Sequence, residues 1–214
     1  LQVMLVRETG EKTAAASLSI AVGSRFDPPQ RQGLAHFLEH MLFLGTQKYP
    51  NANGYQQFIS AHGGSHNAYT SFEQTNYYFD IQNSYLDQAL DRFADFFVSP
   101  LFNAEYVERE INAIEAEYRS RYLDEGRRII DATRSVANPG HPFSQFSVGS
   151  LSSLAGEDLR QQLLDFYQNQ YSADRMRLVV VGDYPLSVLE QMVTSRFSSI
   201  DNRYLGDVSI EQQL

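Results

Sequence analysis

The chain has 214 residues, a formal net charge of −9 and no cysteine. Its acidic residues are scattered and its Lys and Arg residues are not clustered, which argues against nucleic acid or an anionic membrane surface as the main partner. Because cysteine is missing, a disulfide framework, a thiolate metal site and a cysteine nucleophile are excluded. No apolar stretch approaches the roughly 18 residues of a transmembrane helix, so we expect no membrane span.

Two strands are predicted at the start of the chain. Residues 1–7 and 14–23 are rich in β-branched or small apolar residues, and the turn at 9–12 predicts that the two strands pair with each other. A loop is expected at 24–32, where Asp27 precedes two prolines. This loop leads into the apolar run 33–45, which we expect to be a helix.

That helix would carry half of a metal site. His36 and His40 are four residues apart, so on a helix they lie on the same face with Cβ atoms about 5–6 Å apart, and both rings can reach one ion. Glu39 lies roughly 60° round the helix from His36. It can border the ion without binding it, where a general base would take a proton from water. The alternative is that both histidines are core residues bonded to backbone carbonyls, with Glu39 solvated.

Helices and strands alternate along the rest of the chain. Helices are expected at about 51–62, 86–97, 103–123, 127–136, 157–169 and 186–197, and strands at 65–71, 75–82 and 176–182. No long linker, short repeat or low-complexity segment divides these elements. One α+β domain over residues 1–214 is the simplest account.

A third ligand is needed, because catalytic zinc usually has three protein ligands and an open position for water. Carboxylates gather on the predicted helix 103–123. Its expected core-facing stripe consists of Val107, Ile111, Ile114, Tyr118 and Tyr122. Glu110 and Glu117 flank one edge of this stripe, and Glu108 and Glu115 flank the other. Periodicity does not choose between the two edges.

These carboxylates also have an ordinary structural explanation. Glu115 precedes Arg119 by four residues and Glu117 precedes Arg121 by four, the favoured order for helical ion pairs worth about 0.2–0.5 kcal/mol each. The remaining histidines are expected to be structural or surface residues. They are His62, His66 and His141.

Several segments spread over nearly the whole chain resemble one family. They are HFLEH at 36–40, MLFLGT at 41–46, KYP at 48–50, GGSHNA at 63–68, TNYYF at 75–79 and NPGHP at 138–142. In these segments the chain resembles the pitrilysin/insulysin family of metallopeptidases, the inverzincins, whose H-x-x-E-H order reverses the common zincin motif. The insulysin branch is the most similar.

The resemblance implies a complete zinc site. In the family the third ligand is a Glu at a fixed distance after the second His, and from His40 that position is Glu117. The ligands to Zn²⁺ would then be His36, His40 and Glu117, with Glu39 as the general base. The carboxylate that supports the site in the family corresponds to Glu110.

The resemblance also implies how a peptide substrate is held. The family uses a strand edge to bind an extended peptide, and the matching residues are Asn67, Ala68 and Tyr69. Backbone groups of such an edge can pair with any peptide while pockets select side chains. The alternative is that this segment is a plain strand of the sheet.

The family fold implies a mixed, largely antiparallel sheet with helices packed on it. The chain would be the zinc-bearing N-terminal domain of a larger endopeptidase, whose homologous C-terminal half supplies further substrate groups, so the isolated chain is expected to cleave poorly. A non-catalytic scaffold or peptide-binding relative is the alternative function. The resemblance implies a periplasmic location for a bacterial, pitrilysin-like protein and a cytoplasmic one otherwise.

Overall fold

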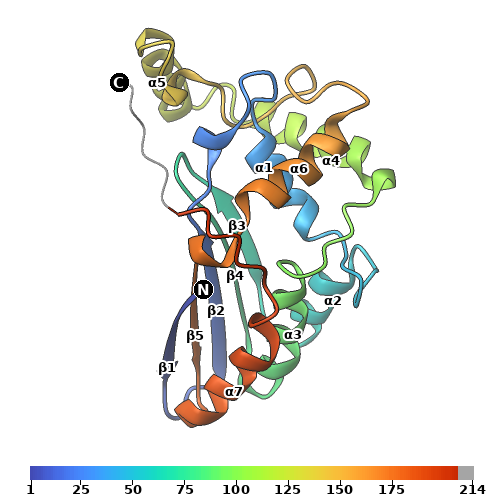
Figure 1. The fold of residues 1–214 in the computed structure, drawn as a ribbon, viewed down its shortest axis with the longest axis vertical. Helices are drawn as coiled ribbons and strands as arrows, with labels where there is room; N and C mark the ends of the chain where they lie inside the picture. The colour runs from blue at the N-terminus through green and yellow to red at the C-terminus, as the bar shows by residue number, and fades with distance from the viewer. Residues whose placement is uncertain (207–214) are drawn as a thin grey trace.

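Strands form where the sequence alternates or is continuously apolar, and together they make one mixed sheet. The computed structural model describes residues 1–206. Within them the strands are β1 (Gln2–Arg7), β2 (Thr13–Ile20), β3 (His66–Thr70), β4 (Thr75–Gln82) and β5 (Met176–Gly182). Their order across the sheet is β1-β5-β2-β4-β3 (Figure 1). Among these strands, β1 and β5 run parallel and the other neighbours antiparallel. The expected α+β fold with a mixed, largely antiparallel sheet is confirmed.

The expected pairing of the first two strands with each other is wrong. β5 lies between them, parallel to β1 and antiparallel to β2, so that Leu178 stands opposite both Val3 and Leu18. The reason is burial. Residues 178–181 are apolar throughout, and such a strand is favoured inside a sheet with both neighbours present. β1, whose Val3 and Met4 are exposed, takes the edge.

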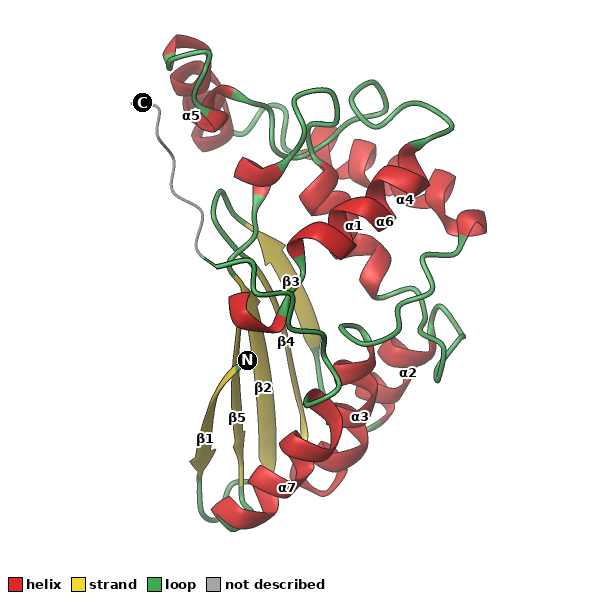
Figure 2. Ribbon diagram, viewed as in Figure 1, coloured by secondary structure: helices red, strands yellow, loops and turns green. Residues whose placement is uncertain are grey.

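The helices form two groups. In the described part of the chain they are α1 (Leu34–Leu42), α2 (Gly54–Ala61), α3 (Leu86–Asp95), α4 (Ala104–Ser120), α5 (Glu125–Val136), α6 (Leu159–Gln170) and α7 (Leu186–Phe197). α3 and α7 pack together on one face of the sheet, and α2 lies beside α3 (Figure 2). α1 contacts α4, α6 and the edge strand β3. The helix with the two histidines therefore lies next to both the carboxylate-rich helix and the strand edge.

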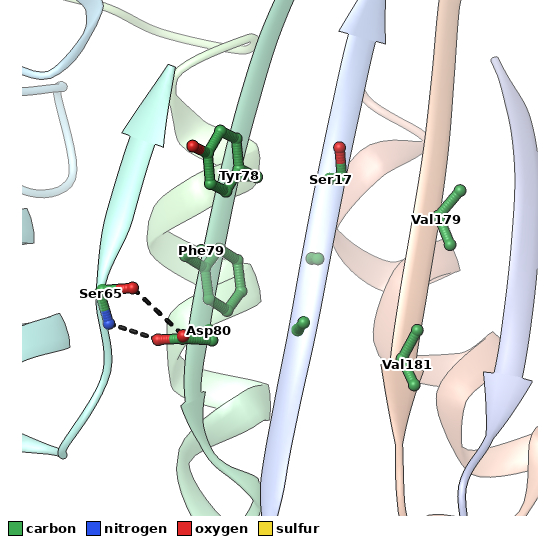
Figure 3. A pocket seen from close by; sticks show the side chains of 9 residues that line it. Ser17, Ser65, Tyr78, Phe79, Asp80, Val179 and Val181 are labelled. Atoms are coloured by element: carbon green, nitrogen blue, oxygen red, sulfur yellow. Dashed lines mark hydrogen bonds between the residues drawn. The ribbon is translucent and has the colours of Figure 1, made fainter.

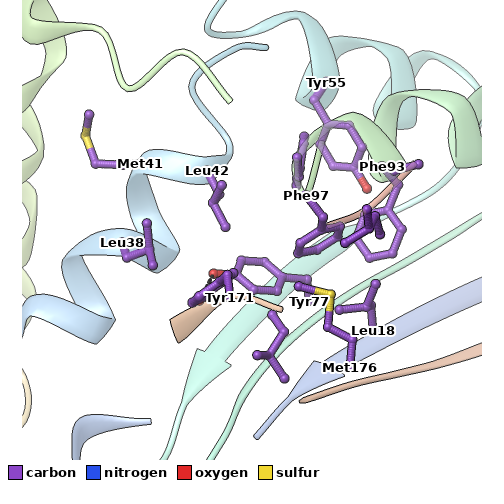
Figure 4. Close-up of a cluster of buried hydrophobic side chains, with 14 of the residues drawn as sticks. Leu18, Leu38, Met41, Leu42, Tyr55, Tyr77, Phe93, Phe97, Tyr171 and Met176 are labelled. Atoms are coloured by element: carbon purple, nitrogen blue, oxygen red, sulfur yellow. Dashed lines mark hydrogen bonds between the residues drawn. The ribbon is translucent and has the colours of Figure 1, made fainter. Parts of the chain in front are cut away.

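Side chains from the sheet and from both helix groups share one core. Tyr77 of β4 packs edge-on against Phe97, with ring centroids 5.5 Å apart, and Phe93 of α3 is fully buried close by. Leu38 and Leu42 of α1 enter the same cluster (Figure 4). Burying a side chain of this size stabilises a fold by about 1.5–3 kcal/mol. The burial of Leu38 and Leu42 thus fixes the rotation of α1 about the helix axis.

Small residues line the opposite face of the sheet. Ala15 and Ser17 of β2 lie between Tyr78 of β4 and the pair Val179 and Val181 of β5, and together they line a shallow hollow (Figure 3). Side chains of a strand alternate between its two faces. The residues of these strands that point to the helices are buried, whereas Ala15, Ser17, Val179 and Val181 are half-buried and Tyr78 is exposed.

The apolar stripe of α4 is shorter than expected. Ile114 is fully buried, and Val107 and Ile111 pack against the core. Tyr122 is 61% exposed, because the helix ends at Ser120 and the tyrosine no longer follows the helical stripe. Over residues 1–206, none of the helices has the length and apolar character needed to cross a bilayer.

Candidate metal centre

A buried carboxylate holds the start of α1. Asp27 accepts hydrogen bonds from the backbone N–H groups of Gly33 (2.7 Å) and Ala35 (2.8 Å), which pairs donors that the first turn of a helix leaves free. Gly33 has a φ of 94°, and a Cβ there would lie 2.3 Å from the Cα of Gly149. Glycine is therefore required at this position. The close approach brings the carbonyl of Val148 against α1.

α4 presents two carboxylates to α1. Glu110 and Glu117 are two turns apart on the same edge of the helix, and Ile114 between them is fully buried. The two helices are in contact. The Glu110 side chain is 11% exposed and the Glu117 side chain 32%. The edge of α4 that carries Glu110 and Glu117 is therefore the one that meets α1.

The other edge of α4 serves a different purpose. Glu115 accepts hydrogen bonds from Arg119 Nε (2.6 Å) and from the backbone N–H of Leu151 (2.9 Å), which ties α4 to the following loop. The second predicted helical ion pair is also present, because Arg121 Nη2 lies 3.5 Å from Glu117 Oε1. This pair leaves Glu117 Oε2 directed to the histidines, so the ion pair and the contact with α1 coexist.

Three potential ligand atoms converge between the helices. Glu117 Oε2 lies 3.5 Å from His36 Nε2 and 3.7 Å from His40 Nε2, and ligand atoms of these three residues all lie within 4.8 Å of one another. No other group of three His, Asp or Glu residues in the described ranges has this arrangement. A small adjustment of these side chains would place all three atoms at zinc-ligand distances of about 2.0–2.2 Å.

The outer nitrogen of each imidazole has its own partner. His36 Nδ1 donates to the carbonyl oxygen of Val148 (2.7 Å), and His40 Nδ1 donates to Glu110 Oε2 (3.3 Å). These bonds direct both Nε2 atoms at Glu117. Imidazoles that bind metals usually donate their second N–H to a carbonyl or carboxylate in this way. The donor set of two nitrogens and one carboxylate oxygen fits zinc.

Contacts within the site shift the pKa values of its two histidines and of its two α4 glutamates. Burial, with help from His40, lowers the pKa of His36. Burial also opposes the charged form of His40, but the hydrogen bond to Glu110 and the nearby carboxylate of Glu117 outweigh it and raise its pKa to about 9. The contact with His40 lowers the pKa of Glu117 to about 2. Although burial raises the pKa of Glu110, His40 and Arg109 hold it below its usual range.

Glu39 lies at the same cleft but outside the group of three. It is 7% exposed, and its Oε2 accepts a hydrogen bond from Thr70 Oγ1. Burial raises the pKa of Glu39 to about 7, against the hydrogen bond from Thr70 and the charge of His40, which lower it. A carboxyl with a pKa near neutrality is suited to accept and release a proton.

The cleft also contains the strand edge. Asn67, Ala68 and Tyr69 of β3 line it together with Glu39 and the two histidines. β3 pairs with β4 on one side and is the last strand of the sheet. Arg121 and Arg127 lie on the cleft wall as well. The cleft is therefore lined by the three potential ligands, by Glu39 and by the predicted strand edge, whereas Glu110 lies behind His40 and contacts the site through that ring.

The remaining histidines have structural contacts. His62 Nδ1 donates to the carbonyl of Phe58 (2.7 Å). The ring of His66 packs against Phe43, with centroids 5.3 Å apart. His141 accepts a hydrogen bond from the N–H of Phe143 (3.1 Å) at the start of a short 3₁₀ turn.

Three contacts of the site could not be found from the residue pattern. Val148 contributes a backbone carbonyl, so its side chain gives no signal. Thr70 is one ordinary threonine in a predicted strand. Asp27 stands before two prolines in a predicted loop, too far ahead of the helix to be recognised as its N-cap.

Comparisons with known proteins point to one family. Residues 2–140 match the family described as Insulinase (Peptidase family M16), and residues 158–213 match the Peptidase M16 inactive domain. The insulin-degrading enzyme of Bos taurus is 43% identical over 95% of this chain, and that of Homo sapiens is 42% identical over 95%. The putative zinc protease mug138 of Schizosaccharomyces pombe is 41% identical over 95%.

The chain covers only part of these relatives. It spans 20% of the insulin-degrading enzymes and 22% of the Schizosaccharomyces pombe protein. The crystal structure of pitrilysin superposes with a TM-score of 0.93 at 36% identity, over 97% of this chain and 23% of that one. The family match covers more than half of the chain, and the resemblance noted in the sequence is confirmed. The chain belongs to the insulinase family of peptidases, peptidase family M16.

Proposed function

We propose that this chain is the zinc-binding catalytic unit of an endopeptidase that hydrolyses peptides or small proteins. The observation that carries the proposal is the convergence of His36 Nε2, His40 Nε2 and Glu117 Oε2 between α1 and α4. Glu110 and the Val148 carbonyl would hold the two imidazoles in the orientation that zinc requires.

Bound zinc supplies a Lewis acid that polarises a carbonyl oxygen and lowers the pKa of a water molecule towards about 7. Its binding needs neutral imidazoles, so His40 would release the proton that Glu110 and Glu117 favour. His36, whose pKa is lowered by burial, is already neutral at pH 7. Both histidines would then face the ion through Nε2.

Glu39 would act as the general base. Its carboxylate lines the cleft beside the histidines, and burial raises its pKa to about 7. It would take a proton from the attacking water and pass it to the nitrogen of the leaving amine. General acid–base catalysis of this kind contributes about 10²–10⁴-fold to a rate.

The substrate would bind as an added strand on β3. Asn67, Ala68 and Tyr69 stand at the edge of the sheet and line the cleft. An edge strand offers unpaired N–H and C=O groups to an extended peptide. Such binding depends on backbone groups, which supports a broad range of peptide substrates.

We further propose that the domain works inside a longer polypeptide whose homologous C-terminal half completes the cleft. The relatives are about five times as long as the segment they share with this chain. The scaffold alternative is less well supported, because His36, Glu39, His40 and Glu117 are all present and gathered in one cleft.

The test uses the full-length protein. We expect one equivalent of zinc per site by elemental analysis, and cleavage of an internally quenched peptide that a chelator abolishes and added zinc restores. Zinc binding without cleavage would support the scaffold alternative. Cleavage that survives complete removal of metal would contradict the proposal.

A further inference from the structure

The strand that lines the cleft also contacts the carboxylate to which we assign the role of base. Thr70 is the last residue of β3, and its Oγ1 donates a hydrogen bond to Glu39 Oε2 (2.5 Å). Within residues 1–206 it is the only hydrogen bond made by the Glu39 carboxylate. Leaving a buried acceptor unpaired costs about 1–3 kcal/mol. The bond therefore restricts rotation of the Glu39 carboxylate and leaves its other oxygen for water.

The neighbouring hydroxyl of Thr75 shows which way the Thr70 hydroxyl donates. Thr70 stands opposite Thr75 of β4, with the two hydroxyl oxygens 3.4 Å apart. Thr75 is fully buried, and its hydroxyl donates to the carbonyl of Val22 (2.9 Å). A hydroxyl has one proton to donate. Because Thr75 uses its proton on Val22, the proton of Thr70 is directed to the nearer oxygen, Glu39 Oε2, and the longer contact between the two threonines is not a second donation by Thr70.

We propose that Thr70 is a positioning residue, which holds the Glu39 carboxylate by one oxygen and ties it to the strand that binds the peptide. The inference rests on the proposed function, because it takes Glu39 as the base and β3 as the binding edge. Thr70 directly follows Asn67–Tyr69 on β3. One strand would thus align both the scissile bond and the group that activates water, which lowers the cost of bringing them together.

The experiment compares two pairs of proteins that differ by one hydroxyl. In the full-length protein, wild type is compared with T70V, which keeps the shape of the side chain, and T70S is compared with T70A. T13V is the matched control, since it makes the same change at an exposed position at the other end of the sheet. For each protein kcat, KM and zinc content are measured, and E39Q is measured in parallel.

We expect the hydroxyl-bearing member of each pair to have the higher kcat, by roughly 10- to 100-fold. KM and zinc content should be the same within each pair. The control T13V should behave like wild type. A structural role alone would lower zinc content or change KM and would not separate T70S from T70A. If T70V fails to fold, T70S and T70A decide. Equal kcat within the pairs, with E39Q inactive, overturns the role of Thr70 alone. An active E39Q overturns the assignment of the base, and with it the proposed function.

Discussion

His40 on α1 and Glu117 on α4 meet across the contact between the two helices, with His40 Nε2 3.7 Å from Glu117 Oε2. His36 Nε2 approaches the same oxygen at 3.5 Å. Because that oxygen is shared, the position of Glu117 on α4 determines whether both histidines meet the same carboxylate. The arrangement of the whole centre depends on how the two helices pack.

Replacement of Glu117 by Gln is expected to abolish zinc binding under conditions that load wild type fully. The change removes the one carboxylate charge among the three converging side chains. Metal content after dialysis against limiting zinc is the measurement. Glu108→Gln on the exposed side of the same helix is the control. A zinc-loaded E117Q protein would rule out the assigned ligand set.

Glu39→Gln should keep zinc and lose about 10²–10⁴-fold in kcat, because the amide cannot accept a proton. Elemental analysis and hydrolysis of a quenched peptide by the same preparation separate the two properties. Loss of metal together with activity would point to a ligand or structural role for Glu39. Wild-type turnover would refute the assignment as base.

Glu110→Gln is expected to weaken zinc binding about 10- to 100-fold without abolishing it. Glu110 Oε2 accepts the Nδ1 proton of His40 (3.3 Å), and loss of such a supporting carboxylate has effects of this size. Competition with a zinc-sensitive dye gives the affinity. An affinity equal to that of wild type would show that Glu110 does not orient His40.

Asp27 should make the stability of the chain depend on pH. Burial raises its pKa to about 7 from an ordinary value of 3.8, although the N–H groups of Gly33 and Ala35 lower it. The folded state therefore holds this proton more tightly, so the contribution to stability is full below pH 3.8 and is lost as the pH rises through about 7.

The measurement is urea denaturation of wild type and D27N at a series of pH values. The amide that D27N carries at this position does not titrate, so D27N serves as the reference. The free energy of unfolding of wild type minus that of D27N should fall as the pH rises from about 4 to about 7. The slope should be at most about 1.4 kcal/mol per pH unit. A difference that stays constant or rises over this range would contradict the raised pKa of Asp27.

Ile114→Ala should destabilise the chain by about 2–5 kcal/mol, because it removes a fully buried side chain. It should also weaken zinc binding, since Ile114 lies between Glu110 and Glu117 on the face of α4 that meets α1. Ile129→Ala on an exposed face of α5 is the control. Destabilisation with unchanged zinc affinity would show that α4 is held by other contacts.

The local parts of the site were predictable from residue spacing. Helical periodicity places His36 and His40 on one face, with Glu39 beside them, whatever the rest of the chain does. The limits of most helices and strands are similarly local, because apolar periodicity and turn residues act over a few positions. α4 shows where this fails, since Tyr122 continues the pattern after the helix has ended.

The pairing of distant segments was not predictable from the residues. Spacing left Glu110 with Glu117 and Glu108 with Glu115 as equal choices, and resemblance to a family was needed to choose between them. In the structure the choice follows from which edge of α4 meets α1. Likewise, β5 separates β1 from β2 because its apolar run is better buried between two neighbours.

The sequence by itself determined the chemistry available to this protein. Two imidazoles lie one helical turn apart with a carboxylate beside them, and the absence of cysteine leaves His, Asp and Glu as the ligands for a metal. Residue spacing left open which carboxylate meets the imidazoles, and the tertiary structure decides it physically; only the tertiary structure showed that Thr70 and Val148 hold the site. Spacing along a helix is a local property, whereas contact between helices depends on burial summed over the whole core.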